Sequence, residues 1–163
     1  MTELQRLRAD HAAALLAFER DNRAYFAASI SDRGDAYFER FGEQHEAMLA
    51  EQEAGTAAYH VLVAGDGRVL GRFNLRFAGA GTAELGYRVA EDAAGRGVAT
   101  AAVEELCRIA ASRYGLRMLR AATSTDNIAS QRVLLKAGFV AAGPADPADI
   151  GGKTGSWYER TLA

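Results

Sequence analysis

Apolar residues recur along the chain at two spacings, one typical of helices and one typical of strands. A short strand is expected before Ala9. Helical spacing then predicts one helix from Asp10 to about Ser29 and, after a break at Ile30 to Gly34, a second helix from Asp35 to about Gly55. The chain is therefore expected to begin with one strand and two long helices.

The middle of the sequence alternates between apolar runs and turn residues. The segment AAYHVLVAGDGRVLGRFNLRF holds two apolar runs around Asp66-Gly67, a pair typical of tight hairpin turns. A second turn at Gly79 to Thr82 leads to a third run, AELGYRVA. A helix is expected from about Gly97 to Tyr114, where Gly115 ends it. These patterns predict a three-stranded meander followed by a helix.

The last third of the chain completes an alternating α/β pattern. A strand is predicted from Leu116 to Ser124, and Asp126 or Asn127 is expected to cap a helix that ends at Gly138. Two final strands, FVAAGPA and SWYERTLA, are joined by the glycine-rich stretch Gly151 to Gly155. Strand, crossover helix and strand predict parallel pairing. The predicted order is β-α-α-β-β-β-α-β-α-β-β, a mixed α/β sheet of about seven strands in one domain, residues 1–163.

Composition narrows the class of protein. With 163 residues, 49% hydrophobic and 25% charged, the chain is typical of one soluble globular domain. A net charge of -2 gives no large basic footprint for nucleic acid. The sequence contains no apolar run long enough to span a membrane and no signal-peptide pattern. The lone Cys107 suits a cytoplasmic location, and the spacing of His11, His45 and His60 does not predict a metal site.

The segment VAEDAAGRGVATAAVEEL places two glycines directly before a predicted helix. Small residues follow at Val98, Ala99 and Thr100, so another group could approach the first turn closely. Because the first N–H groups of a helix are unpaired, such a turn can bind phosphate, although it can also be a plain tight connection. GRGVAT lacks the lysine of a Walker motif and the third glycine of a dinucleotide fingerprint.

The element order, this turn and the later segment NIASQRVLLKAGF together resemble the GNAT superfamily of acyl-CoA N-acyltransferases over nearly the whole chain. N-x-x-S followed by KAGF is similar to the Rim-type branch, which acetylates protein N-termini. The resemblance implies that Gly95 to Ala99 wrap the coenzyme A pyrophosphate, with N–H groups of about Arg96 to Thr100 as donors. Arg96 could add charge. Ala94 departs from the family pattern, which has Gln or Arg there, and implies weaker support for this loop with binding retained.

The resemblance also assigns roles in catalysis. The N–H of Val89 would polarise the thioester, and Glu84 would remove the amine proton directly or through water, unless it is simply an exposed edge residue. Relatives use a tyrosine seven residues after the helix asparagine to protonate the thiolate; here that position is Leu134, and Ser130 is the expected substitute or else only a helix residue bonded to backbone. Asn127 would cap its helix and bind the pantetheine arm. The expected coenzyme-binding residues are thus Val89, Gly95, Arg96, Gly97, Val98, Ala99, Thr100, Asn127 and Ser130.

These residues predict an acetyl-CoA-dependent N-acetyltransferase that acts on a primary amine, first of all a protein or peptide N-terminus. Transfer would be direct, because no placed nucleophile is evident, and no G-x-S-x-G elbow is present. Polyamines and antibiotic amines are competing acceptors. A non-catalytic coenzyme A-binding module, favoured by Ala94 and Leu134, and a scaffolding homodimer are the alternatives from other classes. Neither a metal, nucleic acid nor a membrane is expected as a partner.

Overall fold

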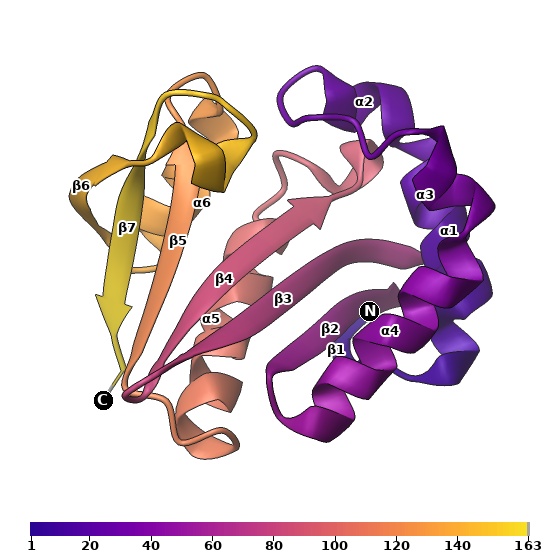
Figure 1. Cartoon of the computed structure of the whole chain (residues 1–163), viewed down its shortest axis with the longest axis horizontal. Coiled ribbons are helices and arrows are strands. Elements are labelled where there is room, and N and C mark those ends of the chain that lie inside the picture. Colours follow the sequence, from indigo (N-terminus) through magenta and orange to yellow (C-terminus); the bar gives the residue numbers. More distant parts are fainter. Residues whose placement is uncertain (163) are drawn as a thin grey trace.

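The computed structural model describes residues 1–162 and shows the predicted mixed α/β architecture (Figure 1). Seven strands form one sheet in the order β1-β2-β3-β4-β5-β7-β6. The strands are β1 Thr2–Arg6, β2 Ala57–Ala64, β3 Val69–Gly79, β4 Thr82–Val89, β5 Met118–Ser124, β6 Val140–Ala145 and β7 Gly155–Thr161. The helices are α1 Ala12–Asp21, α2 Arg23–Ala27, α3 Asp35–Glu39, α4 Phe41–Ala54, α5 Val98–Ser112 and α6 Ile128–Lys136, with short 3-10 turns η1 Ala9–His11, η2 Glu91–Ala93 and η3 Pro147–Ile150.

The two long N-terminal helices predicted from the sequence are each broken, so that prediction was wrong in detail. The first breaks at Asn22, whose side-chain amide donates to the Phe18 carbonyl at 2.9 Å and accepts the Glu91 N–H at 3.0 Å. Asparagine competes for backbone groups in this way, and here the tertiary bond to Glu91 fixes the break. The second breaks at Arg40, whose backbone leaves the helical conformation (φ -108°, ψ 24°) between α3 and α4.

The connection between the last two strands also differs from the expected glycine hairpin. The chain leaves β6 at Ala145, forms η3 and returns through Gly151 and Gly152, both at positive φ, before β7 begins at Gly155. β7 then lies between β5 and β6. This placement holds the outer edge of β5 along its whole length, from Met118 opposite Thr161 to Ser124 opposite Gly155.

β4 and β5 form the predicted parallel pair, but only over a short distance. Thr82 to Glu84 pair with Met118 to Arg120, and no further pair follows among the described residues although both strands continue. Figure 1 shows β4 and β5 diverging beyond this point, with α5 behind the opening. The other edge of β4 stays paired with β3 as far as Val89 opposite Gly71. The sheet therefore opens into a V between β4 and β5.

Each face of the sheet carries its own hydrophobic core. On one face α5 and α6 pack against the strands in a core whose side chains are fully or nearly fully buried, among them Phe73, Leu75, Leu85, Leu106, Leu119 and Leu134. The other face is covered by α1 to α4, where Leu15, Phe18 and Phe41 of the helices share a core with Tyr59 and Val61 of β2. Burying each such side chain contributes about 1.5 to 3 kcal/mol. Because side chains alternate along β4, Tyr87 and Val89 face α5, whereas Glu84, Gly86 and Arg88 face the N-terminal helices.

The close contact between β5 and β7 yields a first prediction. A Cβ added to Gly155 would overlap with the Thr123 carbonyl oxygen and lie 2.8 Å from Ser124 Cα. Since these are backbone atoms that cannot move aside, Gly155→Ala should lower the free energy of unfolding by about 3 kcal/mol in urea denaturation. A Cβ at Gly86 would meet nothing within 4 Å, so Gly86→Ala is the matched control. Equal stability of the two variants would contradict the described packing.

Candidate functional site

Two hollows meet where β4 and β5 separate. The first, the α5 cleft, has a volume of about 390 Å³ and is lined by the first turn of α5, one side of α6, the end of β4 and the segment around α2. The second, the β3 cleft, has a volume of about 350 Å³ and is lined by β3, β4, β5 and the turn around η3. The residues that line both are Ser29, Ile30, Tyr87, Arg88, Asn127 and Ser130. The V therefore forms a passage from one face of the sheet to the other.

The turn before α5 has the geometry of an anion site. Gly95 and Gly97 both have φ of +74°, a conformation that glycine adopts without strain. The first helical bond runs from the Ala101 N–H to the Gly97 carbonyl, so the three N–H groups from Val98 to Thr100 have no intrahelical partner. Small side chains keep these groups accessible, and the positive end of the helix dipole favours a negative ligand.

The predicted coenzyme-binding residues of this turn divide into two sets. Gly95, Gly97, Ala99 and Thr100 line the α5 cleft. The Val98 side chain packs against the core instead, and the exposed Arg96 donates to the Asp92 carbonyl. These two residues can therefore contribute backbone N–H groups, while the structure directs their side chains elsewhere.

The backbone of β4 presents donors to the V. The Ala90 N–H donates to the Leu70 carbonyl at 2.8 Å, so it points toward β3. Because successive N–H groups of a strand point to alternate sides, those of Val89 and Tyr87 point away from β3, into the gap left by β5. Val89 also lines the α5 cleft. The residue proposed from the sequence to polarise a carbonyl thus has its N–H directed into the opening.

Tyr87 and Ser130 form a hydroxyl pair where the two clefts join. The Tyr87 hydroxyl lies 2.9 Å from Ser130 Oγ and donates to the Ser130 carbonyl at 3.2 Å. Burial raises the pKa of Tyr87 to about 12, partly offset by the bond to Ser130, so the phenol stays protonated at neutral pH. Asn127 caps α6 by accepting the Ser130 N–H at 3.2 Å. Leu134, at the position where relatives have tyrosine, is fully buried.

Tyr87 lines both clefts and was not among the site residues predicted from the sequence. Its ring stacks on Phe73 with centroids 5.8 Å apart, which fixes the direction of the hydroxyl. The available signal was its position on the strand face directed at the helix that carries Ser130. No spacing rule links the two residues, because they lie 43 positions apart.

Glu84 lies apart from this group. It is exposed on β4, shares a strand face with Gly86 and lines neither cleft. In the sheet register it stands between Arg76 on β3 and Arg120 on β5. Val89 lies five residue steps further along the strand, about 17 Å at 3.3 Å per residue. Proton transfer to Glu84 from a group near Val89 would therefore need intervening water.

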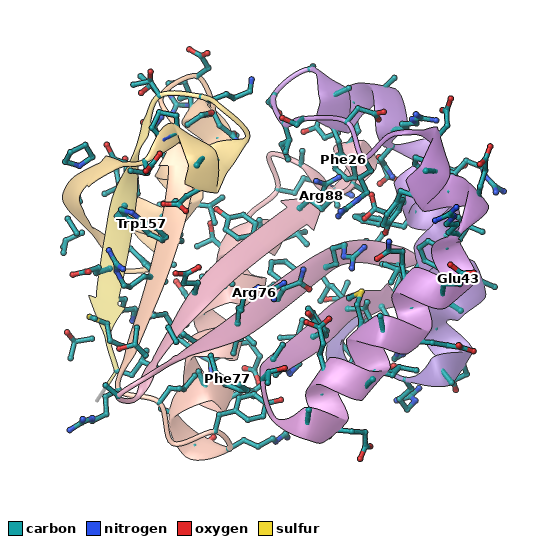
Figure 2. The ribbon with its side chains drawn as sticks, in the orientation of Figure 1. Phe26, Glu43, Arg76, Phe77, Arg88 and Trp157 are labelled. Atoms are coloured by element: carbon teal, nitrogen blue, oxygen red, sulfur yellow. The ribbon has the colours of Figure 1, made fainter. Side chains whose placement is uncertain are left out.

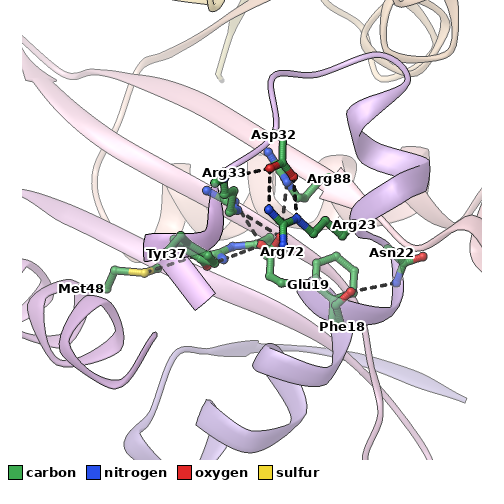
Figure 3. A network of polar contacts seen from close by, with 11 residues as sticks. Phe18, Glu19, Asn22, Arg23, Asp32, Arg33, Tyr37, Met48, Arg72 and Arg88 are labelled. Carbon is green, nitrogen blue, oxygen red and sulfur yellow. Dashed lines mark hydrogen bonds and ion pairs between the residues drawn. The ribbon is translucent and has the colours of Figure 1, made fainter. Parts of the chain in front are cut away.

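A buried ionic cluster forms one wall of the β3 cleft (Figure 3). The Glu19 side chain, 1% exposed, lies 2.7 Å from Arg72, 3.0 Å from Arg33 and 3.3 Å from Arg88. Burial alone would raise the pKa of Glu19, but its hydrogen bond to Arg33 and the three arginine charges outweigh this, so the pKa lies below the ordinary value. Sequence reasoning missed the cluster because its members come from α1, the segment after α2, β3 and β4.

Arg88 ties this cluster to the N-terminal helices. Its guanidinium lies 4.8 Å from the centre of the Phe26 ring, and Figure 2 shows the two side chains together beside the end of β4. Burial, followed by the nearby charge of Arg33, lowers the pKa of Arg88 to about 10. Two aromatic residues of β7 lie outside both clefts: Tyr158 is buried in the core, and the Arg120 guanidinium lies 4.3 Å from the centre of the Trp157 ring.

The part of the chain that the structure describes provides neither a cluster of metal ligands nor a membrane-spanning helix. Residues 1–162 contain no cluster of three His, Cys, Asp or Glu side chains suited to a metal ion. His60, for example, is buried beside Tyr114, and its pKa falls to about 4 through burial and then the charge of Arg113. Within the same residues, every helix is too short or too polar to cross a membrane.

Residues 2–140 match the family model described as the acetyltransferase (GNAT) domain. The chain belongs to this family. The predicted fold and enzyme class, an acetyl-CoA-dependent N-acetyltransferase, are therefore confirmed. A comparison with curated protein sequences finds no significant match.

Solved structures with the same fold include several acetyltransferases. The ribosomal-protein-S5-alanine acetyltransferase of Vibrio fischeri superposes with a TM-score of 0.89 at 19% identity, covering 99% of this chain and 93% of that one. RimJ of Mycobacterium smegmatis, solved with CoA-disulfide, gives 0.86 at 22% identity over 98% and 81%. The microcin C7 self-immunity acetyltransferase MccE, solved with acetyl-CoA and AMP, gives 0.84 at 18% identity over 98% and 93%.

The buried cluster of Glu19 with Arg33, Arg72 and Arg88, called the Glu19 cluster below, should stabilise this GNAT domain. Glu19→Gln leaves three arginines without their shared carboxylate, and breaking a buried pair in this way costs about 3 to 5 kcal/mol. Because the folded-state pKa of Glu19 lies below 4.5, its contribution is fully present above pH 4.5 and is lost as the pH falls through the folded-state pKa. Urea denaturation of both proteins from pH 7 to pH 3 should show their difference shrinking below pH 4.5. A difference that is constant with pH would contradict this.

Proposed function

We propose that this GNAT domain transfers an acetyl group from acetyl-CoA to a primary amine, in the first place a protein or peptide N-terminus. The observation that carries the proposal is the V between β4 and β5, where the α5 cleft meets the β3 cleft at Tyr87 and Ser130. A donor bound on one side and an acceptor bound on the other would meet at this junction. Direct transfer needs such a meeting point, because positioning two reactants supplies much of the rate enhancement.

The α5 cleft fits the coenzyme. The unpaired N–H groups from Val98 to Thr100 suit a pyrophosphate, and Arg132 and Lys136 add positive charge to the same cleft. Ala94 also lines the cleft and brings no side-chain donor, so the main chain would hold the pyrophosphate. Asn127 lines both clefts, where a pantetheine arm would pass toward the junction. Bound acetyl-CoA would supply the thioester; the other roles belong to side chains and backbone groups of this chain.

Three groups of the chain would act on the thioester and the amine. The Val89 N–H stabilises the oxyanion that forms on the carbonyl oxygen, a contribution of a few kcal/mol in a dry site. Glu84 receives the amine proton through water. The Tyr87 hydroxyl, kept protonated by its raised pKa, supplies a proton to the departing thiolate directly or through Ser130 Oγ. In this proposal Tyr87 and Ser130 together replace the tyrosine that Leu134 displaces from α6.

Two observations support an N-terminal amine as the acceptor: the similarity to a solved acetyltransferase structure and the positive charge of the β3 cleft. The Vibrio fischeri protein is described as an alanine acetyltransferase for a ribosomal protein, which supports an N-terminal amine. Arg33, Arg72 and Arg88 line the β3 cleft, and these charges would repel a polyamine. A cytoplasmic location and a homodimer stay predictions.

Binding of the coenzyme to the turn before α5 can be tested by calorimetry. Ala99 lines the α5 cleft, so Ala99→Phe should block the pyrophosphate and weaken acetyl-CoA binding at least about tenfold, 1.4 kcal/mol. Ala101 is exposed on the same helix and lines neither cleft, which makes Ala101→Phe the matched control. Equal affinities of the two variants would place the coenzyme elsewhere.

Catalysis can be tested by thiol release from acetyl-CoA with peptides that begin with alanine or serine. Tyr87→Phe, Ser130→Ala and Glu84→Gln should each lower kcat by about a hundredfold, the scale of general acid and base catalysis, while acetyl-CoA binding is retained. Glu43→Gln, exposed on α4, serves as control (Figure 2). Full activity of Tyr87→Phe would remove the phenol from the mechanism. Binding of acetyl-CoA without turnover of any amine would favour a coenzyme-binding module.

A further inference from the structure

The β3 cleft carries more positive charge than its own carboxylates neutralise. Four basic side chains line it: Arg33, Arg72, Arg88 and Lys153. Against them stand Asp149, exposed on η3, and Glu19, buried behind the arginines. The cleft is therefore electropositive, which is unexpected at a site that receives an amine, since most amines arrive as cations.

The arginines share a single carboxylate. All three contact the two oxygens of Glu19, and Arg72 also donates to the Tyr37 hydroxyl at 3.0 Å. Arg72 is 5% exposed, yet its Nε has no hydrogen-bond partner within the described residues. A buried guanidinium is costly unless its donors and its charge are satisfied. The cluster thus has unused capacity for a second anion.

A second buried group without a partner lies on the same strand face. Asn74 follows Arg72 by two residues on β3, and its Oδ1 is buried without a hydrogen-bond donor in the described part of the chain. Asn74 and Arg72 both line the cleft, and Gly86 and Arg88 stand opposite them on β4. A Cβ at Gly86 would meet nothing within 4 Å, so the strand surface beside Asn74 is open. On this face Asn74 Oδ1 can accept a hydrogen bond from an N–H group, and the Arg72 guanidinium, two residues before it on β3, can donate to an anion.

A purely structural role explains only part of this arrangement. Glu19 joins α1 to β3 and β4, and Arg33 joins the segment after α2 to the same point. One carboxylate and one guanidinium could make such a joint with two parallel hydrogen bonds. The two additional arginines add positive charge to the cleft wall without adding a counter-charge. An anionic ligand would supply that charge.

We propose that the β3 cleft binds an anionic group, carboxylate or phosphate, carried by the acceptor molecule itself close to its reacting amine. Arg33, Arg72 and Arg88 hold the anion, and Asn74 Oδ1 accepts a hydrogen bond from the amine. Arg72 and Asn74 are two residues apart on one strand, which sets the separation of the two groups at about 7 Å. The acceptor class is then a short amino acid, a phosphorylated amine, or a peptide with an acidic side chain beside its N-terminus. This inference rests on the proposed function for the acceptor side.

The activity test compares amines that differ only in the anion. The pairs are β-alanine with β-alaninamide, O-phosphoethanolamine with ethanolamine, and the amidated dipeptides Ala-Asp and Ala-Asn. The anionic member of at least one pair should have a kcat/KM about tenfold higher, and the pair that shows this separates carboxylate from phosphate. Arg33, 25% exposed on a connecting segment, can be changed with least effect on folding. Arg33→Gln should abolish the preference and Arg33→Lys should restore part of it.

Arg108→Gln is the control for net charge. Arg108 lies on the exposed side of α5 with Glu105 and lines neither cleft, so its loss removes the same charge far from the site. This variant should keep the wild-type preference. Equal kcat/KM within every pair, or the same preference in Arg33→Gln as in wild type, would overturn the proposal.

A binding test covers the case in which no amine turns over. O-phosphoethanolamine and β-alanine are titrated by calorimetry into protein saturated with coenzyme A, which blocks the phosphate turn before α5. Binding of either to wild type and to Arg108→Gln, but at least about tenfold more weakly to Arg33→Gln, supports the anion site even if transfer fails. No binding to the coenzyme-saturated wild type, or equal binding to Arg33→Gln, overturns it. Failure of transfer alone would instead count against the proposed function.

Discussion

The site depends on one constraint, the early end of pairing between β4 and β5. Continued pairing would bond the N–H groups of Val89 and Tyr87 to β5 and close the passage between the two faces. The strands can separate because each keeps its outer neighbour: β4 stays bonded to β3 as far as Val89, and β5 to β7 as far as Ser124. Paired outer edges therefore keep both strands extended while their inner edges remain available for a ligand.

Much of the fold could be predicted because it is determined by residues that are neighbours in the sequence. The features that were not predicted depend on contacts between distant residues. The Asp66-Gly67 turn, the Asn127 cap and the glycines before α5 each act through neighbouring residues, so strand and helix order could be predicted. The break at Asn22 depends on its bond to Glu91, 69 positions away. The glycine turn before α5 could be predicted because its residues are contiguous in the sequence. The Tyr87–Ser130 pair and the Glu19 cluster were missed because folding alone brings their members together.

In the proposed mechanism, the Tyr87 phenol takes the place of a residue that relatives carry on α6. Leu134 fills the core on α6, where a tyrosine hydroxyl would have to point into the V. Tyr87 reaches the Ser130 backbone and side chain from β4, so a hydroxyl stands at the junction of the two clefts although it comes from a different element. The family's sequence motif registers the missing tyrosine at position 134 but does not include the Tyr87 hydroxyl on β4. Loss of the motif tyrosine is therefore weak support for a domain without activity.

The charge of the β3 cleft also bears on the nucleophile. Direct transfer needs a neutral amine, and nearby positive charge favours the neutral form because it lowers the pKa of an ammonium group. Glu84 is exposed and far along the strand from Val89. A cleft that already favours the neutral amine over the ammonium form therefore needs less proton removal by Glu84. The same charge would exclude a plain cation. An acceptor that brings its own anion resolves the conflict: the anion gains the arginines, and the amine enters a field that keeps it reactive.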